Sequence, residues 1–224
     1  MVRWATFMQL KRTRLRLRSL RPALATFALT ALSLASCSVG QGEGFAEGRI
    51  RLDDCAVNLA SYAMRPNFFG ADYIESPGDI DGETRMVNLQ MQRGSYREGD
   101  SDGIYIFVRD VNLIGREGLG MPIDLAPTTG VEPLVHMTFY ANQTCESGQP
   151  REFWRIPGVL PAVSGTITFD AVRAEDVPGS GDAFIGHFEN VVFQSPDDPV
   201  RRNAELNGAF SFFFQRGAPA QRFP

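Results

Sequence analysis

Lysine is almost missing from this chain of 224 residues, because Lys11 is the only one among 22 basic side chains. A phosphate-binding loop of the Gly-x-x-x-x-Gly-Lys type and a Ser-x-x-Lys nucleophile motif both require lysine, so neither exists after residue 11. A Gly-x-Ser-x-Gly nucleophile elbow is absent as well. We therefore expect no catalytic residues and a protein that is not an enzyme.

Histidine is also scarce, with His136 and His187 as the only two. Both alternate with apolar residues in extended patterns, which predicts solvent-facing positions on strands rather than metal ligands. The three cysteines are too widely spaced for a zinc site. The sequence thus predicts no metal centre of the zinc type.

Acidic residues are missing from residues 1–36, which carry seven basic ones, and residues 23–35 are uncharged. A basic segment, a short apolar core and small residues before a cleavage site are the parts of a secretory signal. Thirteen uncharged residues are too few to span a bilayer, which requires about 20. We expect residues 1–36 to be a cleaved signal peptide.

The signal ends in Leu34, Ala35, Ser36 and Cys37. This stretch resembles the lipobox of bacterial lipoprotein precursors, in which the cysteine is acylated and becomes the first residue of the mature protein. The resemblance implies lipid on Cys37 and a place in the bacterial cell envelope. Ser38, where an aspartate would retain the protein at the inner membrane, favours the outer membrane; the periplasmic and surface faces both stay open.

Removal of residues 1–36 leaves 15 arginines against 26 acidic residues, a net charge of −11 over 188 residues. Affinity for nucleic acid comes largely from basic side chains that neutralise phosphates. The acidic balance therefore argues against nucleic acid as a partner. It also argues against electrostatic binding to anionic lipids.

Short extended segments with period-two alternation, bounded by Gly, Pro and Asp, fill the mature chain. Residues 104–109, 135–140 and 166–171 are the clearest examples. Such patterns are typical of antiparallel strands with one buried face. We predict an all-β protein, an antiparallel β-sandwich of about eight or nine strands in a single domain over residues 49–216. A lipidated Gly-rich tether over residues 37–48 precedes it, longer loops cover residues 115–130, 141–162 and 194–203, and a tail follows over residues 217–224.

Cys55 and Cys145 remain once Cys37 is assigned to lipid. An even number of cysteines in an exported chain predicts a disulfide. The alternative, a redox or nucleophilic pair, lacks a Cys-x-x-Cys spacing and a nearby histidine.

Two Asp-x-Asp-Gly stretches contain Asp79 and Asp81, and Asp100 and Asp102. Calcium requires six to eight oxygen ligands, and neither stretch supplies the later ligands of a calcium loop. Asp-Gly is also a strong hairpin signal, so we interpret both stretches as turns. Calcium stays possible but is not favoured, and no other cofactor is expected.

Trp154 lies in the predicted loop that follows Cys145. Its indole ring either stacks on a sugar or fills the core beneath the loop. The sequence leaves three hypotheses for the mature domain. The first is a non-catalytic structural or protein-interaction module, the second a carbohydrate-binding module that uses Trp154, and the third an envelope hydrolase.

Overall fold

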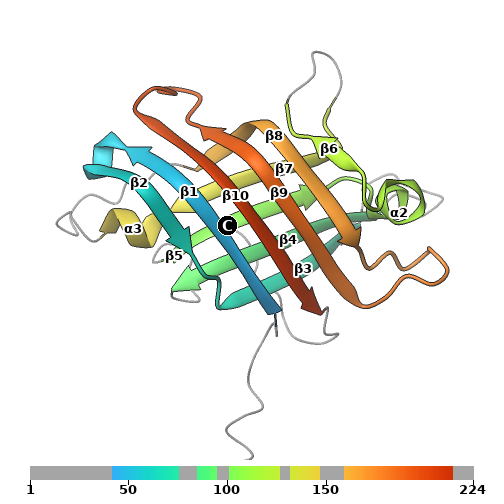
Figure 1. The fold of residues 1–224 in the computed structure, drawn as a ribbon. Helices are drawn as coiled ribbons and strands as arrows, with labels where there is room; N and C mark the ends of the chain where they lie inside the picture. Colours follow the sequence, from blue (N-terminus) through green and yellow to red (C-terminus); the bar gives the residue numbers. More distant parts are fainter. Residues whose placement is uncertain (1–41, 76–84, 95–100, 127–131, 147–158, 214–224) are drawn as a thin grey trace, which may run out of the picture. The chain divides into compact units, whose positions relative to one another are not determined.

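The computed structural model describes residues 42–75, 85–94, 101–126, 132–146 and 159–213, all within a compact unit that spans residues 39–224. Ten strands form one antiparallel sheet (Figure 1). The first five are β1 (Gly42–Leu52), β2 (Val57–Met64), β3 (Phe68–Glu75), β4 (Arg85–Gly94) and β5 (Ser101–Val108). The others are β6 (Pro122–Asp124), β7 (Val135–Ala141), β8 (Leu160–Ala171), β9 (Ala183–Gln194) and β10 (Arg202–Phe213).

Helical structure is limited to four short segments in the described residues. They are η1 (Asp53–Cys55), α2 (Val111–Leu113), η3 (Ile114–Gly118) and α3 (Asn142–Glu146). Asp110 starts α2, because its side chain accepts a hydrogen bond of 2.9 Å from the backbone N–H of Leu113. The all-β, antiparallel prediction is confirmed; the described residues form ten strands, where about eight or nine were predicted.

The strands follow the order β2-β1-β10-β9-β8-β7-β5-β4-β3, and β6 pairs with β8. The sheet does not divide into two separate sheets, because β8 pairs with β7 at its start and with β9 over the rest of its length. The sheet curls, so that β1, β10, β9 and β8 cross in front of β3, β4, β5 and β7 in Figure 1. The two halves enclose the core.

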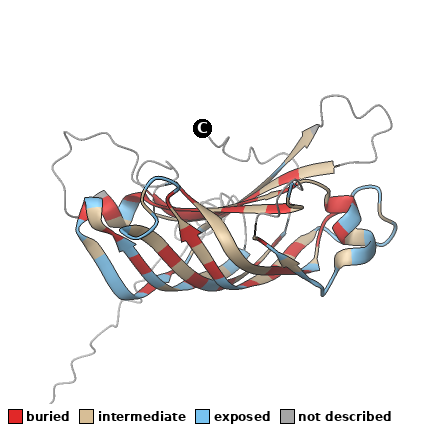
Figure 2. Ribbon diagram, turned by 90° about the horizontal axis from the view of Figure 1, so that it is seen from above, coloured by how far each residue is buried: buried red, intermediate tan, exposed pale blue. Residues whose placement is uncertain are grey.

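Aromatic side chains join the two halves inside the sheet. Phe69 of β3 stacks on Phe212 of β10 with ring centroids 5.6 Å apart, although the two strands are distant in the strand order. Phe139 of β7 lies 5.8 Å from Phe193 of β9. Buried and exposed residues alternate along the strands in Figure 2, as the period-two patterns predicted.

A line of irregular pairing crosses the half of the sheet formed by β8, β9, β10, β1 and β2. The register shifts between β8 and β9 around Gly165, between β9 and β10 where Glu189 and Asn190 lie opposite Asn207, and between β1 and β2 where Ala60 and Ser61 lie opposite Arg49. They lie side by side because Leu206 pairs with both Val191 and Gly48. We call Gly48, Gly165, Asn190 and Asn207 the crease; extra residues in a strand bend it and increase its twist.

Two contacts fix the crease. Gly165 has a φ of 105°, and a Cβ atom there would lie 2.6 Å from the Cα of Val191, so only glycine fits. The backbone N–H of Asn190, whose φ is 52°, donates a hydrogen bond of 2.7 Å to the side-chain oxygen of Asn207.

Several segments differ from the sequence-based expectation. Residues 42–48, predicted as tether, form the first half of β1, because they pair with β10 along their whole length. The predicted loop over residues 115–130 contains η3 and β6, and the one over residues 141–162 contains α3 and the start of β8. Residues 37–41 and 217–224 lie outside the described residues.

Among the described residues, no helix combines the length and the apolar character that a bilayer crossing requires.

The sulfur atoms of Cys55 and Cys145 lie at bonding distance, with their Cα atoms 5.2 Å apart. The predicted pair therefore joins the turn before β2 to α3 across 90 residues of chain. A cross-link over a loop of that length stabilises the folded state by about 4–5 kcal/mol on the loop-entropy model.

We expect the double variant Cys55→Ser/Cys145→Ser to unfold at lower urea concentration than the parent, with a free energy of unfolding lower by about 4–5 kcal/mol. Urea titrations with and without reductant measure the difference. Reductant should destabilise the parent and leave the double variant unchanged; equal stability of parent and variant under oxidising conditions would contradict the cross-link.

Candidate functional site: a buried carboxylate, a creased face and an open edge

The structure describes only some of the predicted site residues. Cys55 and Cys145 come together, whereas Cys37, Asp79, Asp81, Asp100 and Trp154 lie outside the described residues. Asp102 is described, and its prediction as a turn residue is wrong. It lies within β5, where it pairs with both Arg93 of β4 and Ala141 of β7, and it is 0% exposed.

Asp102 is the centre of a buried cluster beside the disulfide. Its carboxylate accepts hydrogen bonds from the Arg93 guanidinium at 2.5 Å and from the Tyr62 hydroxyl at 3.1 Å. Thr144, the residue before Cys145, donates from its backbone N–H at 2.9 Å and from its hydroxyl at 2.6 Å. A buried carboxylate needs this many donors, because each unsatisfied oxygen would cost free energy.

The cluster is suited to holding elements together rather than to proton transfer. Burial, and after it the negative charge of Asp102, raises the pKa of the Tyr62 hydroxyl far above its usual value, so Tyr62 stays a protonated donor. Its four residues come from β2, β4, β5 and α3, so they connect both halves of the sheet to the disulfide. Sequence reasoning missed this role because Asp102-Gly103 has the residue pattern of a turn.

A second polar network lies on the opposite face of β4 and β5. Gln92 donates to the Ser101 hydroxyl at 2.7 Å, and Gln90 donates to the side-chain oxygen of Gln92 at 2.5 Å. Tyr140 of β7 lies across Gly103, where a Cβ atom would be 2.3 Å from the tyrosine oxygen. Glycine at that position therefore lets the tyrosine reach both glutamines, at 3.3 Å each.

The histidines occupy the positions that the alternation predicted. His136 is half-buried with its ring centroid 6.0 Å from that of Phe107, while Val135 and Met137 on either side are buried. His187 lies 3.4 Å from the carboxylate of Asp170. Within the described part of the chain, no group of three or more His, Cys, Asp or Glu side chains is arranged to hold a metal ion.

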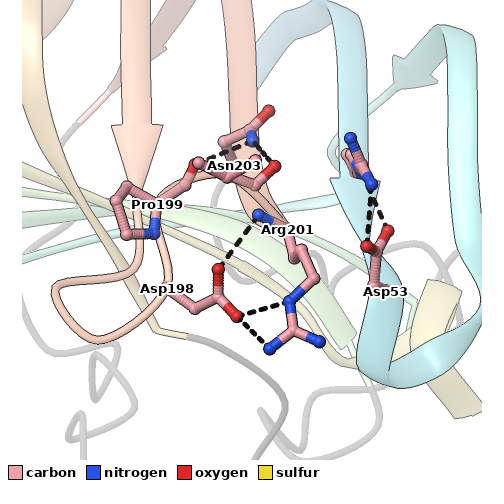
Figure 3. A network of polar contacts seen from close by, with 7 residues as sticks. Asp53, Asp198, Pro199, Arg201 and Asn203 are labelled. Atoms are coloured by element: carbon pink, nitrogen blue, oxygen red, sulfur yellow. Dashed lines mark hydrogen bonds and ion pairs between the residues drawn. The ribbon is translucent and has the colours of Figure 1, made fainter.

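Ion pairs close the turn between β9 and β10 (Figure 3). Asp198 accepts hydrogen bonds from the Arg201 guanidinium at 2.7 and 2.6 Å and from the Arg201 backbone N–H at 3.2 Å. The side-chain amide of Asn203 donates to the carbonyls of Pro199 and Val200, at 2.9 Å each. The Arg51 guanidinium likewise donates two hydrogen bonds to the carboxylate of Asp53, at 2.8 and 2.9 Å.

The solvent-facing side of β2, β1 and β10 has a shallow open hollow of about 570 Å³ at the crease. Gly48 contributes no side chain to it, and its charged lining includes Glu47, Arg49 and Glu205. Arg49 forms an ion pair with Glu205 there. The hollow is polar and too open to exclude water from a ligand, so it fits a contact surface better than an enclosed binding pocket.

β2 forms the edge of the sheet next to this hollow. Residues 58–61 are exposed, and no strand of the described residues pairs with the outer side of β2. An unpaired edge presents a row of backbone donors and acceptors to any strand that approaches it.

No protein-family model, curated protein or solved structure matches the chain. The candidate site therefore consists of the features that the geometry itself provides: the creased polar face and the open edge of β2, held in place by the Asp102 cluster and the disulfide.

We expect Asp102→Ala to lower the free energy of unfolding by about 3–5 kcal/mol, because it leaves Arg93 and the buried hydroxyl donors without their acceptor. Asp102→Asn keeps an oxygen acceptor and should lose less. Urea titration measures both. Asp72→Ala, an exposed carboxylate on β3, is the matched control and should change stability by less than about 0.5 kcal/mol; an Asp102→Ala loss as small as that would contradict the cluster's role.

We expect Asp198→Asn to destabilise the protein at neutral pH and to have no effect in acid. The hydrogen bonds from Arg201 lower the pKa of Asp198 below its usual value in the folded state. The stability that this carboxylate contributes is therefore present above its unfolded pKa and is lost as pH falls through its folded pKa.

The test compares urea midpoints from neutral pH down to about pH 3, the range in which paired carboxylates become protonated. The difference between parent and Asp198→Asn should shrink as pH falls. Asp197→Asn removes the same charge from the neighbouring exposed residue and should show no such dependence. A pH-independent difference for Asp198→Asn would contradict the prediction.

Proposed function

We propose that this chain is a bacterial envelope lipoprotein, anchored in the membrane through lipid on Cys37, whose β domain is a non-catalytic module that contacts another protein. The open edge of β2 beside the polar hollow is the observation that carries the interaction role. The basic segment, the short apolar core and the lipobox at residues 34–37 carry the anchor.

The start of β1 supports a short connection between anchor and domain. Gly42, the first residue of β1, follows Cys37 by five residues. Five residues of extended chain span at most about 18 Å. The folded domain would thus be held close to the lipid surface, where a partner anchored in or lying on the same membrane is within reach.

The cross-link between Cys55 and Cys145 supports an oxidising compartment such as the periplasm or the cell surface. The outer membrane stays the favoured location, from Ser38. The net charge of −11 after removal of the signal favours a protein partner over nucleic acid.

A carbohydrate-binding module is the second candidate, because one face of the sheet has suitable chemistry. On the side of β4, β5 and β7 that faces away from the core, the half-buried Tyr105, Phe107 and His136 lie in neighbouring rows. Aromatic rings are groups that stack on sugars, and an imidazole can bond to their hydroxyls. Trp154 belongs to this hypothesis and lies outside the described part of the chain, as do Asp79, Asp81 and Asp100 of the calcium stretches. The fourth carboxylate, Asp102, is described, and its oxygens accept hydrogen bonds from Tyr62, Arg93 and Thr144.

We expect Cys37→Ala to remove the protein from the membrane fraction, because stable attachment would depend on the acyl chains. The measurement is fractionation of cells, with a carbonate wash of the membranes and immunoblotting. Ser38→Ala leaves the cysteine in place and should stay with the membranes. Retention of Cys37→Ala after the wash would refute the anchor.

Photo-cross-linking of the protein in the intact envelope then separates the two candidates. One protein partner in a fixed ratio supports the interaction module. Recovery of glycan without a protein partner replaces it with the carbohydrate-binding module. Amine-reactive reagents are unsuitable, because the chain has no lysine after residue 11.

A further inference from the structure

The outer face of β1, β10 and β9 changes character along the strands. At the crease, Glu47 and Asn207 face the solvent, but toward the start of β1 the outward positions become mostly apolar. They are Phe45 of β1, Ala209 and Phe213 of β10, and Ala183 and Ile185 of β9, which together we call the terminal patch. These side chains point away from the core, because their neighbours Ala46, Phe184 and Phe212 are buried in it.

Phe213 is the most exposed member of the terminal patch. Its side chain is 62% exposed, and every other aromatic side chain of the described residues is less exposed. Its partner across the strand pair is Ala183, whose methyl group is too small to cover the ring. Single exposed apolar residues are common on protein surfaces, whereas apolar residues in adjacent rows mark a contact surface.

The terminal patch lies at the end of the domain that leads to the anchor. Gly42, the first residue of β1, pairs with Phe212, and the Cα atoms of paired residues lie about 5 Å apart. Figure 1 shows the start of β1 beside the end of β10. The chain between Gly42 and Cys37 spans at most about 18 Å. Lipid on Cys37 would therefore hold the terminal patch within reach of the bilayer surface.

The charges around the terminal patch exclude an electrostatic attraction to anionic lipid. Glu43 lies opposite Ser211 at its border. The Arg65 guanidinium lies 5.3 Å from the centroid of the Phe45 ring, and the same side chain pairs with Glu47 at 3.6 Å. The described residues thus give the border no excess of positive charge. Any attraction to a membrane must come from the apolar side chains, which are of the kind that enter the head-group layer.

We infer that the terminal patch rests on the membrane that holds the lipid of Cys37, with the Phe213 ring inserted among the lipid head-groups. The bilayer then covers the apolar side chains, and the polar crease stays in water. This inference rests on the proposed anchor and gives the domain a second contact with the same membrane.

The two contacts have different roles. A patch of this size binds a membrane too weakly to hold the domain alone, but the anchor keeps it at high local concentration beside the lipid. The patch sets the orientation of the domain. Because β1 extends about 33 Å from Gly42 to Leu52, the turn between β9 and β10, which lies beside Leu52, is far from the contact.

The first test measures whether the patch touches lipid in the full-length lipidated protein, reconstituted into phosphatidylcholine vesicles. Ser211→Cys places one free thiol in the patch, because Cys55 and Cys145 are cross-linked and Cys37 would carry lipid. A bimane label on this thiol should lose fluorescence when the vesicles contain lipids with a nitroxide near the head-group. Val200→Cys carries the same label in the turn between β9 and β10, where the side chain is 70% exposed, and should keep its fluorescence.

The second test changes Phe213 in the protein labelled at position 211. Phe213→Asp places a charge where the ring would enter the head-groups, so we expect the nitroxide quenching to be lost. Phe213→Leu keeps an apolar side chain and should retain most of it. Val200→Asp adds the same charge at the far end and should leave the quenching unchanged. Melting curves establish that the variants are folded.

Several outcomes would overturn the inference. They are equal quenching of the labels at positions 211 and 200, quenching at position 211 that folded Phe213→Asp retains, and quenching that requires anionic lipid in the vesicles. A blue shift of the label at position 211 without nitroxide quenching would also overturn it, because protein and not lipid would then cover the patch.

Failure of the anchor is distinguished in the same samples. Parent protein that leaves the vesicles in a carbonate wash refutes the anchor and this inference together. Parent protein that stays attached while the label at position 211 remains unquenched refutes this inference alone.

Discussion

The continuity of one hydrogen-bonded sheet around the core depends on β8. This strand pairs with β7 at its start and with β9 afterwards, so it carries the sheet from one half to the other. Gly165 allows β8 to approach β9 closely, because its positive φ and the proximity of Val191 leave no room for a side chain. The curl of the sheet brings Phe69 of β3 against Phe212 of β10 and takes the apolar faces out of water.

The end of the sheet near α3 is held by different forces. There the covalent link between Cys55 and Cys145 and the hydrogen bonds of Thr144 to Asp102 act on adjacent residues. The disulfide limits the freedom of the unfolded chain, and the hydrogen bonds satisfy a buried charge in the folded state. Together they keep the beginning and the end of β2 in register with the core while its outer edge stays open.

The functional proposals use the parts of the molecule that packing does not explain. β2 is a solvent-exposed edge strand without charge or proline, and its bulge at Ala60 and Ser61 is a feature that natural edge strands use against wrong association. The exposed face beside it is polar and creased. Anchoring within about 18 Å of a membrane would keep this face close to the membrane surface.

The sequence by itself determined the strand class, the pairing of Cys55 with Cys145 and the outward placement of His136, because each depends on local alternation or on residue counting. The sequence also contains the residues that resemble a lipobox, and the lipidation of Cys37 stays a prediction. The tertiary structure decided the rest. Gly42–Gly48 has the composition of a tether, yet it forms a strand because β10 lies beside it. Asp102 has the sequence context of a turn, yet it is buried because Tyr62, Arg93 and Thr144 surround it. Contacts between residues far apart in the chain outweighed local preference at both sites.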